Sequence, residues 1–514
     1  MNNGKSALLL IAACGLGACG ERATEAPAAA EDPTTEAAIR AEGGLPLSAP
    51  SENIYRAHLA AQALIDRGDF VDANQAAIDL TETAPDYIGG WILLGNSALS
   101  GEQFVKATRK AQKVKPGATE AEQLWADINM SFVTNDTAEG LRIAENLCET
   151  YPDSPRAYLV LSGIYTAQLN HAAAREAGRK AVELAPGMAV THANLGFEYM
   201  YNEPKDQTEA QKHFLKAIEL QPDEDNNWVN LGDSHRAAAD LERAAADYSR
   251  ALELDSTNAV AAVKRGHVNS FLGNYDQARA DYDQGIAAGK GKAQTQSTLA
   301  NYRAFVHLHA GNPAAAIDEL QGVNEEIDGM EIPEHQKIAA RNFVLTNIAD
   351  IAFYYDMDDE ATRAVTALAA TLATSGEASG DADFARQQKA TAIFWQGKLD
   401  VELGNFDAAR SKAREFADLL ADDENPRRME RYHEILGLAA LRQGDFEKSI
   451  AEYRQSNLST SPGAGDVKNI YMLATALEAA GRNEEAAELK NQVANWNFNS
   501  AWFAMLRKDA AGKS

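Results

Sequence analysis

The stretch Trp228-Val229-Asn230-Leu231-Gly232 decides the fold, because its pattern returns at a fixed distance along the chain. Its glycine recurs 34 residues later as Gly266, and the aromatic residues that follow, Tyr248 and Tyr282, are also 34 residues apart. Tyr158-x-x-Leu161 and Leu195-Gly196-x-x-Tyr199 stand earlier in the chain at the same phase. Self-similarity at such a period is the mark of a repeat architecture, in which each unit is one supersecondary element.

Each of these units continues with a small residue and, four positions later, a residue that is bulky in three of the four. The small residues are Ala174, Ala210, Ala244 and Ala278, and the later ones are Gly178, Phe214, Tyr248 and Tyr282. Pro186 and Pro222 close two of the units. The whole pattern resembles the tetratricopeptide repeat (TPR), whose consensus is W-x2-L-G-x2-Y, then A, then F, then P.

The resemblance implies an all-α solenoid of stacked helical hairpins wound into a right-handed superhelix. A single hairpin cannot bury its apolar face, so neighbouring hairpins must stack to form one long core. About twelve units can be phased between Ile54 and Ala494. We expect a TPR block of about seven repeats over residues 54–290, a degenerate block over 291–373, a C-terminal TPR block over 374–494, and a capping helix and tail over 495–514.

Short Gly-Asp/Asn-Phe motifs mark the turns inside several hairpins, as in Gly68-Asp69-Phe70 and Gly444-Asp445-Phe446. Glycine ends a helix in the left-handed conformation without steric cost, and Asp or Asn favours a turn or caps the next helix. Three segments interrupt the rhythm and are predicted to be longer loops or hinges. They are residues 287–296, 321–336 and 374–383.

The first residues resemble a bacterial lipoprotein signal. Lys5 precedes an apolar run, Ala7–Leu16, which is too short to span a bilayer and fits a secretory signal over residues 1–18. Leu16-Gly17-Ala18-Cys19 resembles a lipobox, in which the cysteine is acylated and becomes the mature N-terminus. Cys14 is a poorer candidate, and an ordinary cleaved signal is the alternative to lipidation.

Residues 19–53 are rich in Ala, Glu, Pro and Thr and lack helical periodicity, so we expect a disordered tether. The resemblance implies a cell-envelope lipoprotein, with the outer membrane, facing the periplasm, as the expected location. Cys148 is the only cysteine after Cys19, which excludes an internal disulfide framework. It falls in an expected helix and is predicted to be a small buried residue.

The net charge of −27 argues against nucleic acid as a partner, because such a surface repels phosphates. The sequence contains no HExxH, P-loop or CxxC motif. His307 and His309 are two residues apart, so they fall on different helix faces. We therefore expect no enzyme, no cofactor and no metal.

Known TPR proteins bind ligands on the concave face that the first helices of the hairpins form. Mapping that face here gives a hypothetical partner-binding groove with aromatic, polar and basic residues. Its members are Asn194, Phe197, Tyr201, Asn230, Asp233, Arg236, Lys264, His267, Phe271, Tyr302 and Phe305. The alternative is that these asparagines follow the repeat consensus and the aromatic rings simply pack.

The sequence thus favours a membrane-tethered scaffold that binds a protein or peptide and helps to assemble, export or localise it. An extended peptide with acidic groups is the expected ligand, because Arg236, Lys264 and His267 lie among the aromatic residues. Two other readings stay open: a carbohydrate- or peptidoglycan-associated binding protein, and an accessory subunit of an envelope enzyme. The aromatic group Trp496, Phe498, Trp502 and Phe503 is expected to cover the last repeat or to bind a partner itself.

Overall fold

The computed structural model describes residues 44–288, 293–421, 426–459 and 466–512. These residues form 25 α-helices and two 3-10 helices, and the described part of the chain contains no strand. The all-α solenoid of helical hairpins that the sequence predicts is confirmed. The signal, Cys19 and most of the expected tether lie outside the described residues. Of the helices in those ranges, none is both long and apolar enough to cross a bilayer.

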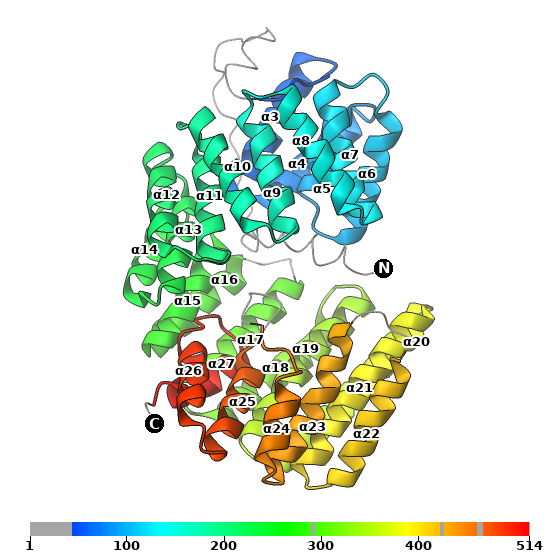
Figure 1. The fold of residues 1–514 in the computed structure, drawn as a ribbon, viewed down its shortest axis with the longest axis vertical. Coiled ribbons are helices and arrows are strands. Elements are labelled where there is room, and N and C mark those ends of the chain that lie inside the picture. Colours follow the sequence, from blue (N-terminus) through cyan, green and yellow to red (C-terminus); the bar gives the residue numbers. More distant parts are fainter. Residues whose placement is uncertain (1–43, 289–292, 422–425, 460–465, 513–514) are drawn as a thin grey trace. The chain divides into compact units, whose positions relative to one another are not determined.

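The chain divides into two compact units, residues 1–262 and 263–514 (Figure 1). The first unit holds α3 (Glu52–Arg67), α4 (Phe70–Thr83), α5 (Ile88–Asn96), α6 (Gly101–Val114), α7 (Glu120–Thr134), α8 (Thr137–Thr150), α9 (Pro155–Ala167), α10 (His171–Leu184), α11 (Ala189–Tyr201), α12 (Gln207–Leu220), α13 (Asp225–Ala237) and α14 (Leu241–Leu254). Helix α15 (Ala259–Leu272) spans the division.

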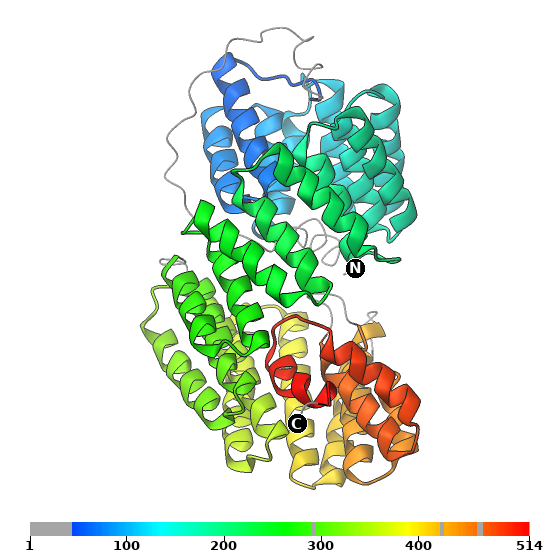
Figure 2. The same ribbon diagram turned by 90° about the vertical axis from the view of Figure 1, so that its left-hand side faces the viewer.

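The second unit continues with α16 (Tyr275–Ala288), α17 (Ala293–His309), α18 (Pro313–Glu326), the 3-10 helix η1 (Ile327–Gly329), α19 (Glu334–Tyr354), α20 (Asp358–Ser379), α21 (Ala382–Glu402), α22 (Phe406–Leu419), η2 (Pro426–Met429), α23 (Glu430–Arg442), α24 (Phe446–Tyr453), α25 (Val467–Ala479), α26 (Asn483–Ala494) and α27 (Ala501–Ala510). Within each unit, consecutive helices pack as antiparallel hairpins and each hairpin stacks on the next (Figures 1 and 2).

A glycine in one helix and an aromatic ring in the next set the spacing of the regular hairpins. A Cβ atom built on Gly232 would lie 2.7 Å from Cε1 of Tyr248, and one on Gly196 would lie 2.7 Å from Cε1 of Phe214. Both rings are fully buried. The Leu-Gly pair of the repeat pattern therefore exists because the paired helix rests its ring directly on the glycine.

The turns inside the hairpins take the expected left-handed conformation. Gly68 and Gly444 have φ values of 87° and 77°, and the Asp445 side chain accepts a hydrogen bond from the backbone of Lys448. Four hairpins reach the same conformation without glycine, at Asn135 (φ 57°), Leu169 (φ 60°), Ala239 (φ 61°) and Asp356 (φ 53°). Asn and Asp visit this conformation readily, but Leu169 and Ala239 lack a side chain that can hydrogen-bond locally. A left-handed backbone costs a residue with a Cβ atom about 1–2 kcal/mol, so these two turns are strained.

The expected loop at residues 374–383 is wrong. Helix α20 runs through Thr374 to Ser379 and ends at Gly380 with φ 65°, and Asp381 caps α21. Gly376 lies inside α20, and a Cβ atom built on it would be 3.2 Å from the Cα atom of Ala385 in α21. The glycine permits close approach of two helices. At the expected seam 321–336, α18 continues to Glu326 and only residues 330–333 are outside helices.

The expected tether also ends earlier than residue 53. Leu45 is 6% exposed and belongs to the apolar core around α7 and α8. The backbone amide of Ser48 donates to Glu122, and Thr119 donates to the carbonyl of Pro46 at 2.8 Å. The chain therefore joins the folded unit by residue 45, and Ser51 caps α3.

Three side-chain contacts fasten the first hairpin to repeats that lie far along the chain. Arg156 of α9 forms a two-pronged ion pair with Asp66, one bond of which measures 2.7 Å. Arg67 pairs with Glu224 at 3.4 Å, and Asn226 donates to Asp69 at 2.8 Å across 157 residues of sequence. We call this group the clasp of the first unit.

Candidate functional site

The exposed side of α11 carries an aromatic platform. Asn194, Phe197 and Tyr201 are each half-buried and follow the i, i+3, i+7 spacing of one helix face. The rings of Phe197 and Tyr201 stack with centroids 6.2 Å apart and planes 2° apart. Phe197 also meets Phe214 of α12 edge-on at 5.2 Å. The structure thus brings together the two aromatic residues that the sequence placed here.

Two asparagines stand at matching positions of neighbouring hairpins. Asn194 on α11 and Asn230 on α13 are half-buried. The carboxamide oxygen of Asn194 accepts a hydrogen bond from Ser162 of α9 at 3.4 Å. Asn194 therefore helps to hold α9 against α11, and Asn230 occupies the matching position on α13.

Asp233 and Arg236 pair with each other inside the first unit. Their side chains are 6% and 7% exposed and lie 3.2 Å apart. The hydroxyl of Tyr248 donates to the same carboxylate at 2.7 Å. The sequence analysis predicted that Arg236 binds an acidic peptide in the groove. In the structure its guanidinium is buried and engaged within the protein, where it joins α13 to α14.

The remaining groove residues belong to the second unit. His267 lies 2.7 Å from the hydroxyl of Tyr282 and meets Tyr302 edge-on at 4.8 Å. Tyr302 in turn meets Phe305 at 5.9 Å. Phe305 and Phe271 are buried, at 1% and 5% exposure. Lys264 is half-buried on α15. His267, Tyr302 and Phe305 therefore form one connected aromatic group, whereas Phe271 packs against His309.

The last described helix, α27, packs against Phe271 and against several helices of the second unit. It contacts α17, α19, α25 and α26, so it does more than cover the end of the last repeat (Figure 2). Phe503 packs edge-on against Phe271 at 5.1 Å, and Arg507 donates to the carbonyl of Phe271 at 2.5 Å. The expected capping helix is present, but it also fills the hypothetical groove of the second unit.

The composition of α27 explains this position. Six consecutive residues, Ala501 to Leu506, are buried. A helix that is apolar all round needs contacts on every side, and the inner surface of a curved stack of hairpins supplies them. Burial of a large apolar side chain contributes about 1.5–3 kcal/mol, so Trp502, Phe503 and Leu506 together account for much of the docking.

A buried charge cluster that the sequence did not reveal lies beside Trp502. The ammonium group of Lys398 is 3.0 Å from Asp350, 3.8 Å from Glu434 and 4.4 Å from the ring centre of Trp395. Burial lowers the pKa of Lys398, although Asp350 opposes the shift. Burial alone would raise the pKa of Glu434, but Lys468 and Lys398 outweigh it and hold that pKa below its usual value.

A cavity of about 260 Å³ borders the cluster, with Glu434, Lys468 and Trp502 in its wall. Two ion pairs in the lining neutralise one another's charges. Lys468 pairs with Glu434, and Arg442 pairs with Glu402 at 2.7 Å. The cluster therefore links α19, α21, α23 and α25 through paired charges.

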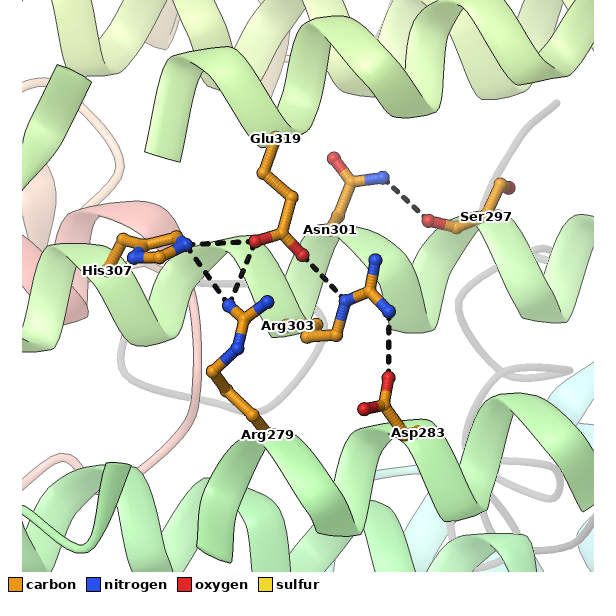
Figure 3. Close-up of polar contacts among 7 residues, drawn as sticks. All are labelled: Arg279, Asp283, Ser297, Asn301, Arg303, His307 and Glu319. Carbon is orange, nitrogen blue, oxygen red and sulfur yellow. Dashed lines mark hydrogen bonds and ion pairs between the residues drawn. The ribbon is translucent and has the colours of Figure 1, made fainter. Parts of the chain in front are cut away.

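A second charged group joins α16, α17 and α18 (Figure 3). The carboxylate of Glu319 lies 2.6 Å from a nitrogen of Arg303, 2.9 Å from one of Arg279 and 3.0 Å from Nε2 of His307. Arg303 also reaches Asp283 at 2.7 Å. Burial by itself would raise the pKa of Glu319, but these two arginines lower it. His309, two residues from His307, lies against Phe271 instead, so the two histidines face different surroundings as predicted.

Cys148 is 7% exposed in α8, which confirms the prediction of a buried apolar role. Burial raises the pKa of its thiol to about 12. Within the described ranges, no three His, Cys, Asp or Glu side chains converge to hold a metal ion. The features that do converge are aromatic and amide surfaces, which suit recognition of another molecule.

Comparison with known proteins supports this description. The sequence family described as "Tetratricopeptide repeat" matches residues 133–189, 206–259 and 396–462. Superkiller complex protein 3 of Homo sapiens is 28% identical over 187 residues, which cover 36% of this chain and 12% of that protein. Anaphase-promoting complex subunit 3 of Schizosaccharomyces pombe is 25% identical over 185 residues, which cover 35% of this chain and 27% of that protein.

Protein O-mannosyl-transferase TMTC1 of Homo sapiens is 27% identical over 156 residues, which are 30% of this chain and 17% of that protein. The chain therefore spans only 12 to 27% of the length of these three relatives. Among solved structures, MamA aligns with a TM-score of 0.29 at 17% identity, over 32% of this chain and 96% of that one. PilW, a type IV pilus biogenesis factor, aligns with a TM-score of 0.34 at 17% identity, over 41% and 95%.

The helical hairpins, the glycine–aromatic contacts and the matched repeats define the class of this protein. The described residues form an α-solenoid of helical hairpins, and the tetratricopeptide repeats matched over residues 133–189, 206–259 and 396–462 are a fold that suits a protein-interaction scaffold.

Proposed function

We propose that the protein is a lipid-anchored TPR scaffold of a bacterial cell envelope that binds a protein or peptide partner on the first unit. The observation that carries the binding role is the half-buried platform of Phe197 and Tyr201 on the same face of α11 as Asn194, with Asn230 at the matching position of α13. Aromatic side chains provide much of the binding energy at protein interfaces, and amides hydrogen-bond to peptide backbones. The buried Asp233–Arg236 pair makes an acidic peptide a weaker expectation than a mixed aromatic and polar one.

The anchoring role rests on the sequence Leu16-Gly17-Ala18-Cys19, which resembles a lipobox. Several acyl chains on one cysteine give stable membrane attachment, whereas one chain alone does not. Cys19→Ser should move the protein from the membrane to the soluble fraction or leave it unprocessed. Normal processing and membrane fractionation of this variant would refute the anchor.

A photo-crosslinking amino acid at position 201 tests the partner site. We expect a specific protein adduct in cells, identified by mass spectrometry. The matched control places the same amino acid at Leu215, an exposed residue of α12 that is 53% accessible. Equal adducts at both positions, or none at position 201, would place the partner elsewhere.

The stacked pair of Phe197 and Tyr201 also supports a second candidate, a carbohydrate-binding scaffold, because flat aromatic platforms stack on sugar rings. Binding of purified peptidoglycan fragments by the intact chain, lost on Tyr201→Ala, would favour this reading. Under the protein-partner proposal, Tyr201→Ala removes the crosslinked protein and the chain shows no affinity for those fragments. We propose no catalytic activity for either role.

A further inference from the structure

Helix α6 carries a strip of positive charge on the outside of the first unit. Its basic residues, Lys106, Arg109, Lys110 and Lys113, are all exposed, and Glu102 is the only acidic residue of the helix. The spacing i, i+3, i+4, i+7 places the four basic side chains on one helix face, and the opposite face is buried. The helix packs mainly against α5 and α7 and lies at the outer edge of the first unit (Figure 1). We call these four residues the basic strip.

The basic strip lacks the acidic partners that lysines have on a comparable helix. Lys212 and Lys216 of α12 each pair with a glutamate three residues away, at 2.9 and 2.6 Å. Within the described ranges, no carboxylate forms an ion pair with any of the four side chains of the strip. Lys110 instead lies 5.8 Å from the ring centre of Trp91. Like charges at these spacings destabilise a helix, so the stability of the fold does not explain the strip.

The N-terminal part of the chain joins the first unit beside this helix. Thr119, which caps α7 just after the end of α6, donates to the carbonyl of Pro46 at 2.8 Å. Leu45 belongs to the same apolar core cluster as Phe104 of α6. A lipid anchor at Cys19 would therefore hold the first unit to a bilayer by a chain that enters the fold next to α6.

We propose that the basic strip of α6 docks on the anionic phospholipid headgroups of a bilayer and so fixes how the first unit lies on the membrane. The proposal rests on the lipid anchor of the proposed function, which brings the chain to a bilayer. A basic amphipathic helix is typical of a membrane-surface element. The apolar face of α6 is buried in the protein, so the contact is made by charge alone, without insertion of apolar side chains into the bilayer.

The net charge of −27 does not prevent this contact. At physiological salt the Debye length is about 8 Å, so acidic groups elsewhere on the protein are screened while the strip touches the headgroups. Each Lys or Arg near an anionic membrane surface strengthens binding about fivefold. Four such residues give weak binding from solution, and the anchor would make it effective because it keeps the strip and the headgroups at a high local concentration.

The test measures sedimentation of the protein with vesicles of equal parts phosphatidylglycerol and phosphatidylcholine. Vesicles of phosphatidylcholine alone serve as the neutral comparison. The protein is the chain from residue 20 onward, which retains every described residue and cannot be acylated at Cys19. At low salt we expect binding to the anionic vesicles only, and about 1 M salt should abolish it because the Debye length falls to about 3 Å. Lys106→Gln combined with Lys113→Gln should weaken binding at least about tenfold, since each lost charge costs about fivefold.

Lys212→Gln combined with Lys216→Gln is the matched control. It removes two lysines from the surface of α12 and changes the net charge by the same amount, but both of these lysines have glutamate partners. Vesicle binding of this variant should equal that of the unaltered chain. An equal loss in the two double variants would show that net charge alone governs binding, and it would overturn the proposal. Unchanged binding of the α6 variant, or equal binding to neutral vesicles, would overturn it as well.

Two further outcomes separate this proposal from its alternatives. Binding of a polyglutamate peptide through the basic strip, without any affinity for anionic vesicles, would assign the strip to an acidic protein partner and refute membrane docking. The vesicle assay uses a chain that carries no lipid, so its failure refutes docking and leaves the anchor standing. Failure of the anchor is seen separately, as normal membrane fractionation of the Cys19→Ser variant. Circular dichroism of both double variants checks that the helices are intact.

Discussion

The contact between Gly232 and Tyr248 allows a quantitative test of the hairpin packing. Gly232→Ala would place a methyl group 2.7 Å from one carbon of the tyrosine ring and 2.9 Å from another. The ring is 0% exposed, and its hydroxyl is held by Asp233 at 2.7 Å. The ring can therefore move only by straining the core or stretching a hydrogen bond to a carboxylate.

The magnitude follows from opposing effects. Overpacking a core costs about 1–3 kcal/mol. A hydrogen bond to a charged group contributes about 1.5–3 kcal/mol, and weakening it loses part of that contribution. Alanine gains about 1 kcal/mol over glycine inside a helix. We expect a net loss of about 1–3 kcal/mol in the free energy of unfolding of the first unit.

Gly163 provides the matched control, because it also lies within a helix but has no atom within 4 Å of a built Cβ. Gly163→Ala should stabilise the first unit by up to about 1 kcal/mol through helix propensity alone. Urea denaturation followed by circular dichroism measures both variants. If Gly232→Ala stabilises the protein as Gly163→Ala does, the ring does not constrain the glycine and the packing argument is wrong.

Four further measurements test other features. Burial raises the pKa of Glu224 from 4.5 to about 7 despite the nearby Arg67. The free energy of unfolding of the first unit should therefore fall by up to about 3 kcal/mol as pH rises from 4.5 through 7. Urea denaturation of Glu224→Gln should show a flatter pH dependence. Burial lowers the pKa of His309 from 6.5 to about 3, and the positive charges of Arg507 and Lys508 lower it further. The free energy of unfolding of the second unit should therefore fall by about 2 kcal/mol as pH drops from 7.5 to 5. His309→Gln should remove that loss. Leu169→Gly should raise the stability of the first unit by about 0.5–1 kcal/mol, since it relieves a left-handed backbone at an exposed turn; an unchanged midpoint would contradict the strain. In a chain without residues 1–19, Cys148 should react with a thiol reagent only after denaturation, and rapid reaction of the folded protein would contradict its burial.

Local pattern was enough to predict the repeat hairpins and their turns. The ring of Tyr248 and the glycine that it covers are 16 positions apart, so their pairing appears as a fixed spacing in the sequence. The same holds for turns such as Gly444-Asp445, where each residue type has a direct conformational reason. Regular repeats are predictable because each unit contacts mainly its neighbours.

The long helices of the second unit departed from that rhythm and were less well predicted. Helices α19, α20 and α21 contain 21, 22 and 21 residues, whereas the helices of the regular repeats contain 13 or 14. The block expected to be degenerate over residues 291–373 contains two of these long helices, and the loop expected at residues 374–383 is helical as far as Ser379. A glycine in a helix interface and a glycine in a turn look the same in one sequence.

In the candidate sites, too, local patterns predicted some features, whereas others depended on residues far apart in the sequence. The repeat pattern assigned Phe197 and Tyr201 to the expected groove, and their rings stack on each other in the structure. No local pattern could show that Arg236 is buried against Asp233, or that Lys398 has a carboxylate partner 48 residues away in Asp350. The aromatic residues of α27 indicated burial, but one of their contacts, Phe271, is more than 200 residues distant.

The clasp of the first unit has a mechanical consequence. An open solenoid can lengthen under tension like a spring, because small rotations at each interface between repeats add up. Here Asp66 is held by Arg156, and Asp69 by Asn226, so separate coils of the unit are tied together. A pulling force on the chain must break these ties before the coils can open. The first unit should therefore resist stretching at low force and then yield abruptly.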